Sequence, residues 1–171
     1  MKLRSLEAVV KALNDAGVPF LVAGGLAVNA HGYGRQTWDL DLVIRLEPEP
    51  IRRTFAALSS LGYRPSVPVT ADGLADREQR RRWVEEKGMT VLNFHSDDHR
   101  ETPIDVFVTE PFDFEREYRE ALVEEIAPGI PVRIIRLSTL LSMKQQAGRP
   151  QDLADVAELR LLHGEAGDER A

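Results

Sequence analysis

The chain has 171 residues, with 22 Lys or Arg, 28 Asp or Glu and no cysteine, which gives a formal charge of −6. This length corresponds to one domain with a full hydrophobic core. The absence of cysteine excludes disulfide scaffolds, thiolate metal sites and cysteine nucleophiles. The acidic balance argues against a protein that grips nucleic acid through a broad basic face.

No segment approaches the roughly 20 consecutive apolar residues that are needed to span a bilayer. The first residues carry positive charge, but the acidic Glu7 and Asp15 follow, and there is no apolar signal core. We therefore expect a cytoplasmic protein with no membrane partner.

The first part of the chain predicts alternating helices and strands. Apolar residues recur at helical spacing over 5–16, and Gly17 ends that helix. The apolar run 19–23 predicts a buried strand, and residues 37–44 alternate with the period of a strand. The other elements expected here are a short helix at 26–31, a helix at 47–61 and an extended segment at 63–69.

The second part predicts one charged helical stretch at 72–87, followed by a hairpin of two strands at 89–95 and 103–109. The elements expected after the hairpin are a short helix at 113–120, strands at 122–126 and 131–135, and helices at 138–147 and 150–162. This mixture predicts an α/β (α+β) fold with a mixed central β-sheet flanked by helices.

Two acidic residues in the strand at 37–44 are the first sign of function. Residues i and i+2 of a strand point to the same face, so Asp39 and Asp41 are expected side by side. Trp38, Leu40, Leu42 and Ile44 are then expected on the other face. Two neighbouring carboxylates repel each other unless a cation or solvent relieves them. Mg²⁺ suits such a pair, because it prefers oxygen ligands and leaves positions open for phosphates.

A third carboxylate, Asp105, lies in the otherwise apolar strand at 103–109. An isolated charge in such a strand is costly unless it meets a partner. If this strand pairs beside the strand of Asp39 and Asp41, three carboxylates converge. Such a set can hold two metal ions about 3.5–4 Å apart, one at the nucleophilic oxygen and one at the leaving phosphate.

Two glycines precede these carboxylates. Gly24 and Gly25 end a strand and open a helix, which leaves backbone N–H groups free to meet an anion. Taken singly, the glycines could form only a tight turn, Asp39 and Asp41 could lie on a solvated strand face, and Asp105 could be a strand-end carboxylate. The order Gly-Gly, Asp-x-Asp and a lone Asp in an apolar strand is much more specific for phosphate chemistry.

The run from Ala23 to Val43 resembles the signature of the DNA polymerase β-type nucleotidyltransferase superfamily, in which Gly-Gly or Gly-Ser precedes Asp-x-Asp. It is similar to small bacterial members: the minimal nucleotidyltransferases, the AbiEii-like toxin enzymes and the aminoglycoside nucleotidyltransferases. The resemblance covers about residues 18–160. It implies a nucleotidyltransferase core at 1–136 and a helical extension at 137–163 that closes the cleft. The polar residues 164–171 are expected to form a flexible tail.

The resemblance also implies an activity, the Mg²⁺-dependent transfer of a nucleoside monophosphate from an NTP such as ATP to an acceptor hydroxyl. Gly24 and Gly25 would hold the triphosphate, and Asp39 and Asp41 would bind both of two Mg²⁺ ions. Asp105 would bind the catalytic ion and help to deprotonate the acceptor. Gly25 departs from the commoner Ser, which removes a hydroxyl contact to phosphate.

A second motif lies near the C-terminus. The spacing Lys-x4-Arg-x2-Asp-x2-Asp, which begins at Lys144, resembles the closing motif of the small bacterial members. Lys144 and Arg149 would then meet phosphate, and Asp152 would orient Lys144 or a substrate hydroxyl. The alternative is charge matching at helix ends. Arg35 and Thr37 are further nucleotide-binding candidates, although Arg35 could equally be a surface residue.

Other clusters favour structural interpretations. The His- and Asp-rich segment 93–99 could bind a metal, but it falls at the connection of the expected hairpin. The basic run 77–82 could meet nucleic acid or an acidic partner, although the interleaved glutamates favour a solvated helix face. His31 is interpreted as a helix-end residue.

Three functions remain open from the sequence. The first is an active nucleotidyltransferase whose acceptor is a small molecule, an RNA or a protein, with residues 63–88 as the variable wall of its site. The second is a nucleotide-binding component of a toxin–antitoxin pair with little or no turnover and a protein partner. The third is a two-metal phosphohydrolase that uses water in place of an acceptor.

Overall fold

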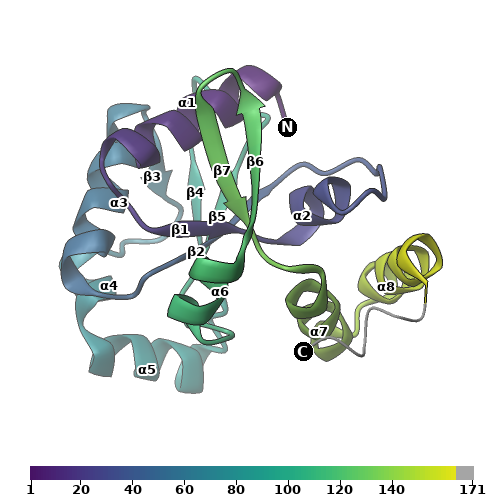
Figure 1. The fold of residues 1–171 in the computed structure, drawn as a ribbon. Helices are drawn as coiled ribbons and strands as arrows, with labels where there is room; N and C mark the ends of the chain where they lie inside the picture. Colours follow the sequence, from purple (N-terminus) through teal and green to yellow (C-terminus); the bar gives the residue numbers. More distant parts are fainter. Residues whose placement is uncertain (165–171) are drawn as a thin grey trace.

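The computed structural model of this chain describes residues 1–164; apart from Gly164, the expected tail at 164–171 lies outside the described residues. Within them the chain forms one mixed sheet of seven strands, in the order β3-β4-β5-β2-β1-β7-β6 (Figure 1). The strands are β1 (Phe20–Val22), β2 (Leu40–Ile44), β3 (Arg64–Pro65), β4 (Val91–His95), β5 (Ile104–Phe107), β6 (Leu122–Ala127) and β7 (Ile130–Ile134). The helices are α1 (Leu3–Asp15), α2 (Gly24–Ala30), α3 (Pro48–Ser60), α4 (Ala71–Ala75), α5 (Arg77–Lys87), α6 (Phe114–Glu120), α7 (Leu137–Ala147) and α8 (Pro150–His163).

The sheet is mixed, as its sequence predicts. β2 runs parallel to β5 and antiparallel to β1, and β1 runs parallel to β7. The expected hairpin is confirmed as the antiparallel pair β4–β5, and the strands expected at 122–126 and 131–135 form a second antiparallel pair, β6–β7. The sheet therefore places β2 and β5, the two strands with acidic residues, next to each other near its centre.

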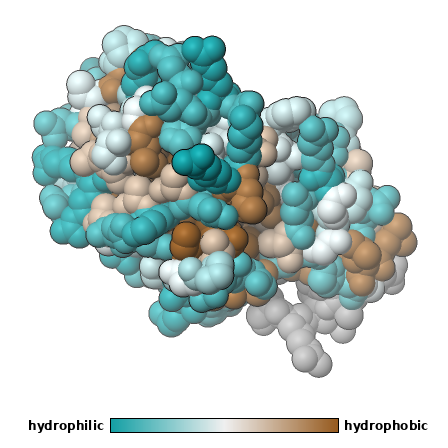
Figure 2. Space-filling view, turned by 90° about the horizontal axis from the view of Figure 1, so that it is seen from above, coloured by the Kyte–Doolittle hydropathy of each residue, from teal (hydrophilic) through white to brown (hydrophobic). Residues whose placement is uncertain are grey.

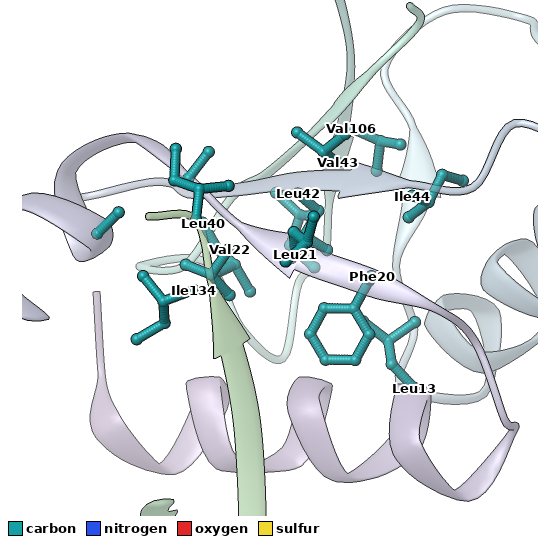
Figure 3. Close-up of a cluster of buried hydrophobic side chains, with 14 of the residues drawn as sticks. Leu13, Phe20, Leu21, Val22, Leu40, Leu42, Val43, Ile44, Val106 and Ile134 are labelled. Atoms are coloured by element: carbon teal, nitrogen blue, oxygen red, sulfur yellow. The ribbon is translucent and has the colours of Figure 1, made fainter. Parts of the chain in front are cut away.

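The hydrophobic core lies around the central strands. All three residues of β1 and four of the five residues of β2 are buried, as short apolar runs in a two-sided sheet should be. Figure 3 shows Phe20 of β1 beside Leu13 of α1, and Ile134 of β7 beside Val22. This packing makes the central sheet a rigid base for the residues at the ends of its strands.

Two predicted elements differ from the observed ones. The single helical stretch at 72–87 is wrong, because α4 ends before Asp76 and α5 begins after it. The Asp76 side chain accepts hydrogen bonds from the N–H groups of Glu78 and Gln79 and thereby caps α5. The strand predicted from residue 37 begins at Leu40, because the three preceding residues form an irregular approach to the sheet.

Helices α7 and α8 pack together at one end of the molecule, away from α3, α4 and α5 (Figure 1). A buried carboxylate fixes the start of α7: Glu117 accepts hydrogen bonds from the Arg136 backbone N–H at 2.6 Å and from Thr139 Oγ1 at 2.7 Å. From above, most of the visible surface is hydrophilic, with hydrophobic residues gathered mainly near the centre of the view (Figure 2). Among the described helices, none combines the length and the apolar character that a bilayer crossing requires.

Candidate active site

A cavity of about 620 Å³ opens between β2, β5, the start of α2 and the pair α7–α8. All of the predicted site residues line it: Gly24, Gly25, Arg35, Thr37, Asp39, Asp41, Asp105, Lys144, Arg149 and Asp152. The first seven come from the β1–β2 region and β5, whereas the last three come from the C-terminal helices and the turn between them. The fold thus brings the two sequence motifs, more than 100 residues apart, to one cavity.

The parallel pairing of β2 and β5 places two of the carboxylates next to each other. Asp41 is the direct register partner of Asp105, and adjacent strands lie about 4.8 Å apart. Asp39 lies just before β2 and is exposed. The expected strand geometry therefore holds for Asp41 but not for Asp39.

The same shift corrects the placement of Trp38. This residue was expected on the apolar face with Leu40 and Leu42, but its side chain is 59% exposed and it lines the cavity. Leu40 and Leu42 are fully buried, as expected. Because the strand begins only at Leu40, its alternation does not extend to Trp38.

The carboxylates raise one another's pKa. Burial, then the negative charges of Asp105 and Asp39, raise the pKa of Asp41 to about 6, against the opposing charges of Lys144 and Arg149. Burial and then Asp105 also raise the pKa of Asp39. Within residues 1–164, no three His, Asp or Glu side chains lie close enough together to ligate one metal ion. The three aspartates thus share one cavity and feel one another's charge without forming a closed cluster.

The two glycines allow the chain to pass very close to the carboxylate strand. Gly24 has φ +61°, and a Cβ atom at this position would overlap with the Asp41 carboxylate. A Cβ atom on the buried Gly25 would overlap with Thr37 Oγ1. The glycines therefore hold the start of α2 against Asp41 and Thr37, with the backbone of this turn facing the cavity.

The close contact at Gly24 leads to a stability prediction with a matched control. Gly24→Ala should destabilise the fold more than Gly88→Ala, measured as the free energy of unfolding in urea. Both glycines have φ +61°, but a Cβ on Gly88 would meet nothing within 4 Å. Gly88→Ala should therefore lower the free energy of unfolding only by the cost of alanine in a left-handed conformation, about 1–2 kcal/mol. Gly24→Ala has the same cost and must also displace Asp41. Equal losses would show that Gly24 is not required for the approach to Asp41.

The C-terminal motif forms a buried ionic network at the opposite wall. Lys144 is 5% exposed, and its Nζ lies 2.9 Å from Asp152 Oδ1 and 2.7 Å from Asp155 Oδ2. Arg149 Nε donates to Asp152 Oδ2 at 2.6 Å and Nη2 donates to Asp152 Oδ1 at 3.3 Å, although the Arg149 side chain is 76% exposed at the rim. Asp152 therefore orients both cations from one carboxylate.

The network extends across the cavity to Arg35. Arg35 Nη2 donates to Asp155 Oδ2 at 3.0 Å, and Arg35 Nε lies 2.8 Å from Asp155 Oδ1 without a hydrogen-bonding angle. Burial alone would raise the pKa of Asp155, but hydrogen bonds from Lys144, Gln151 and Arg35 together lower it. Arg35 is thus an ion-pair partner that ties the approach to β2 to helix α8.

Sequence reasoning missed three residues that contribute to this site. Asp155 was noted only as part of the motif, yet it is fully buried and joins Lys144 to Arg35. Trp38 was assigned to the core. Asn93, which donates to Asp105 Oδ1 at 2.8 Å, was seen only as part of a polar hairpin connection. The local signal for Asp155 was its i+3 spacing from Asp152; Asn93 had none, because its role depends on strand register.

Residues of the His- and Asp-rich segment 93–99 and of the basic run 77–82 have partners in local packing. In the His- and Asp-rich segment, His99 bonds Ser5 Oγ at 2.9 Å and stacks on Tyr63. In the basic run, Arg81 pairs with Glu78 and Glu85 along the exposed side of α5, and the buried Arg80 donates to the backbone carbonyl of Leu74. Both clusters thus take part in local packing and surface pairing.

Comparisons of the sequence with protein-family models and with curated proteins return no match. Solved structures do match. The solution structure of the antibiotic-resistance factor ANT(2'')-Ia superposes with a TM-score of 0.61 at 15% identity, covering 96% of this chain and 85% of that one. A crystal structure of ANT(2'')-Ia with adenylyl-2''-tobramycin gives 0.58 at 14% identity, covering 96% and 90%. JHP933 from Helicobacter pylori gives 0.52 at 18% identity, covering 95% and 65%.

At these identities the likeness concerns the fold. ANT(2'')-Ia is an aminoglycoside nucleotidyltransferase, and its superposition covers 96% of this chain. The chain therefore has the nucleotidyltransferase fold that the resemblance of residues 22–44 implies.

Proposed function

We propose that this protein is an Mg²⁺-dependent nucleotidyltransferase that moves a nucleoside monophosphate from an NTP to an acceptor hydroxyl. The observation that carries the proposal is the single cavity in which Asp39, Asp41 and Asp105 face the Gly24–Gly25 turn and the Lys144–Arg149 motif. One wall offers oxygen ligands for cations, and the other offers cations for phosphate. A metal-bound triphosphate needs both.

The carboxylate wall fits divalent magnesium. Its donors are all hard carboxylate oxygens, which Mg²⁺ prefers. Burial and then the neighbouring carboxylates raise the pKa of Asp39 and of Asp41, and a bound cation would offset both effects. Asp39, Asp41 and Asp105 would hold the metal after drawing closer together than they lie in this structure. The bound metal would polarise the α-phosphate and the attacking hydroxyl and neutralise the leaving pyrophosphate.

The remaining residues bind and orient the nucleotide. The backbone of Gly24 and Gly25 lines the cavity, packed against Asp41 and Thr37, and its N–H groups would meet the triphosphate there. Lys144 supplies a point charge from the cavity wall, and the exposed Arg149 supplies a planar fork at the rim. Asp105, on the carboxylate wall, would accept the proton of the acceptor hydroxyl.

The acceptor hydroxyl belongs to a small molecule, an RNA or a protein. Since ANT(2'')-Ia was solved with adenylyl-2''-tobramycin, an aminoglycoside is the first small molecule to test. A structured RNA and a protein with accessible hydroxyl groups are the other two acceptors to test.

The function is tested with NTPs labelled at the α-phosphate, incubated with Mg²⁺ and each acceptor in turn. We expect the label to move to one acceptor with release of unlabelled pyrophosphate, and to stay in the NTP when EDTA is present. Asp39→Asn should abolish the transfer, whereas Asp15→Asn, in an exposed pair with Lys11, should not change it. Transfer that survives Asp39→Asn would contradict the assignment of the metal-binding wall.

The same assay separates the alternatives. Labelled nucleotide released into water without an acceptor would indicate a phosphohydrolase. Binding of Mg-NTP in isothermal titration, with no product from any acceptor, would favour a nucleotide-binding partner in a toxin–antitoxin pair. Each of these outcomes would contradict the transferase proposal.

A further inference from the structure

We propose that Asn93 is a positioning residue for the reaction, and that it holds the Asp105 carboxylate through the last link of an oriented hydrogen-bond chain. The proposal rests on the proposed function, since Asp105 is the expected proton acceptor there. Asn93 does not line the cavity, whereas Asp105 does. It can therefore act only through Asp105.

The sheet register places Asn93 at its position. In the antiparallel pair β4–β5, Asn93 is the direct partner of Asp105, and in the parallel pair β2–β5, Asp105 is the direct partner of Asp41. Three polar side chains thus lie in one row across neighbouring strands. Asn93 is at the outer end of this row, on the side of Asp105 away from Asp41.

The orientation of the Asn93 amide follows from its two neighbours. Its Nδ2 lies 2.8 Å from Asp105 Oδ1, and its Oδ1 lies 2.5 Å from Ser66 Oγ. With the amide turned over, its oxygen would face the carboxylate oxygen, so that two acceptors would meet without a proton between them. The amide nitrogen therefore donates to Asp105, and the Ser66 hydroxyl donates to the amide oxygen.

The chain continues in the same direction beyond Ser66. Arg64 Nε donates to His95 Nε2 at 3.1 Å, which makes this ring nitrogen an acceptor. The proton of the neutral ring is then on Nδ1, which lies 3.0 Å from Ser66 Oγ and can donate to it. Arg64 begins the chain as a donor; His95, Ser66 and Asn93 each accept one hydrogen bond and donate the next, and Asp105 accepts the last.

A chain of this kind has two effects on Asp105. Aligned hydrogen bonds polarise one another, so the terminal donor holds the carboxylate more firmly than an isolated amide would. Because Asn93 occupies only Oδ1, Asp105 Oδ2 is left without a protein donor among residues 1–164. Asn93 therefore fixes the carboxylate and leaves one oxygen for the cavity.

Two substitutions at Asn93 separate donation from packing. Asn93→Ala removes the donor, and Asn93→Asp keeps the shape of the side chain but places a second carboxylate against Asp105. Both should lower kcat by about 10–100-fold, the usual effect of losing a partner that orients a ligand, while KM for the NTP stays within about threefold. Ser66→Ala, one link further away, should cause a smaller loss. Asn14→Ala, which removes a remote surface bond to the Pro131 carbonyl, should leave kcat unchanged.

A second measurement needs no activity. The side-chain NH₂ of Asn93 can be assigned in a ¹H–¹⁵N spectrum by its absence in Asn93→Ala, and it should shift in Asp105→Asn and in Ser66→Ala but not in Asn14→Ala. An unchanged kcat in both Asn93 variants of an active enzyme would overturn the proposal. An Asn93 NH₂ signal whose chemical shift does not change in Asp105→Asn would also overturn it. If the wild-type chain transfers no nucleotide, the proposed function fails, and the NH₂ signal still decides whether Asn93 holds Asp105.

Discussion

Asp41→Asn is expected to abolish nucleotidyl transfer and, without divalent metal at pH 7, to make the folded protein more stable. Asp41 faces Asp105 across two paired strands and is the most strongly perturbed carboxylate of the cavity. Losing it would remove a proposed metal ligand, and several kcal/mol of transition-state stabilisation with it, so kcat should fall at least about a thousandfold. The asparagine keeps the shape of the side chain and removes a charge that its surroundings disfavour.

The sign of the stability effect follows from the pKa. The folded-state pKa of Asp41 is about 6 and the ordinary value is 3.8, so the folded protein binds the proton more tightly. The contribution of Asp41 to the free energy of unfolding is therefore fully present below pH 4 and is lost as the pH rises through 6. At pH 7 the ionised carboxylate costs up to about 3 kcal/mol, at 1.36 kcal/mol per pKa unit.

Urea unfolding at pH 4, 5, 6 and 7 in EDTA measures this effect. At pH 7 the free energy of unfolding should be higher for Asp41→Asn than for the wild type, and this difference should decrease toward pH 4. Asp15→Asn, at an exposed surface pair, should change stability by no more than about 0.5 kcal/mol at any pH. Magnesium at 100 times its dissociation constant should stabilise the wild type by about 2.7 kcal/mol and the variant much less. A variant that is less stable than the wild type at pH 7 would argue against mutual repulsion in the cavity.

The second large effect is expected at Asp155, where Asp155→Asn should destabilise the fold by about 3–5 kcal/mol. Asp155 is fully buried and lies 2.7 Å from the nitrogen of Lys144, which is itself 5% exposed, and it also pairs with Arg35. Breaking a buried ion pair on one side leaves the opposite charges without compensation. Asparagine retains one acceptor oxygen but neither the charge nor the bidentate contact.

Urea unfolding again provides the measurement, with Asp72→Asn as the control. Asp72 pairs with Arg52 at 2.9 Å on the exposed surface, where such a pair contributes at most about 1 kcal/mol. The folded-state pKa of Asp155 is lowered, so its stabilisation is present above the ordinary pKa and is lost as the pH falls through the lowered value. The gap between wild type and variant should therefore shrink in acid. A loss at pH 7 no larger than that of the control would contradict the role of Asp155 in joining Lys144 to Arg35.

Much of the site was readable from local spacing. The two glycines, the Asp-x-Asp pair and the lone aspartate in an apolar strand pointed to the cavity that the fold assembles, and all of the residues chosen from the two motifs line it. The local sequence also indicates the helix break at Asp76, since an aspartate followed by a charged helical run is a strong N-cap signal. The residues on both sides of Asp76 have helical character, so the pattern alone predicts one continuous helix over 72–87.

Three features could not be read in this way. Trp38 is not on the apolar face because β2 begins three residues later than its alternation suggests. Asp155 pairs with Arg35 across 120 residues, and Asn93 meets Asp105 only because β4 and β5 pair in one particular register. Such partners are chosen by packing between distant segments, and a shift of one residue would turn each strand side chain to the opposite face.

The sequence by itself determined the chemistry of this protein: which residue types are present, and the short-range spacing that puts glycines before a carboxylate strand and cations before two aspartates. The tertiary structure decided which charges meet. It placed Asp41 against Asp105, Lys144 between two aspartates and Asn93 behind the expected proton acceptor. Spacing along the chain fixes the local faces of helices and strands, whereas the contacts between those faces depend on sheet register and helix packing over the whole fold.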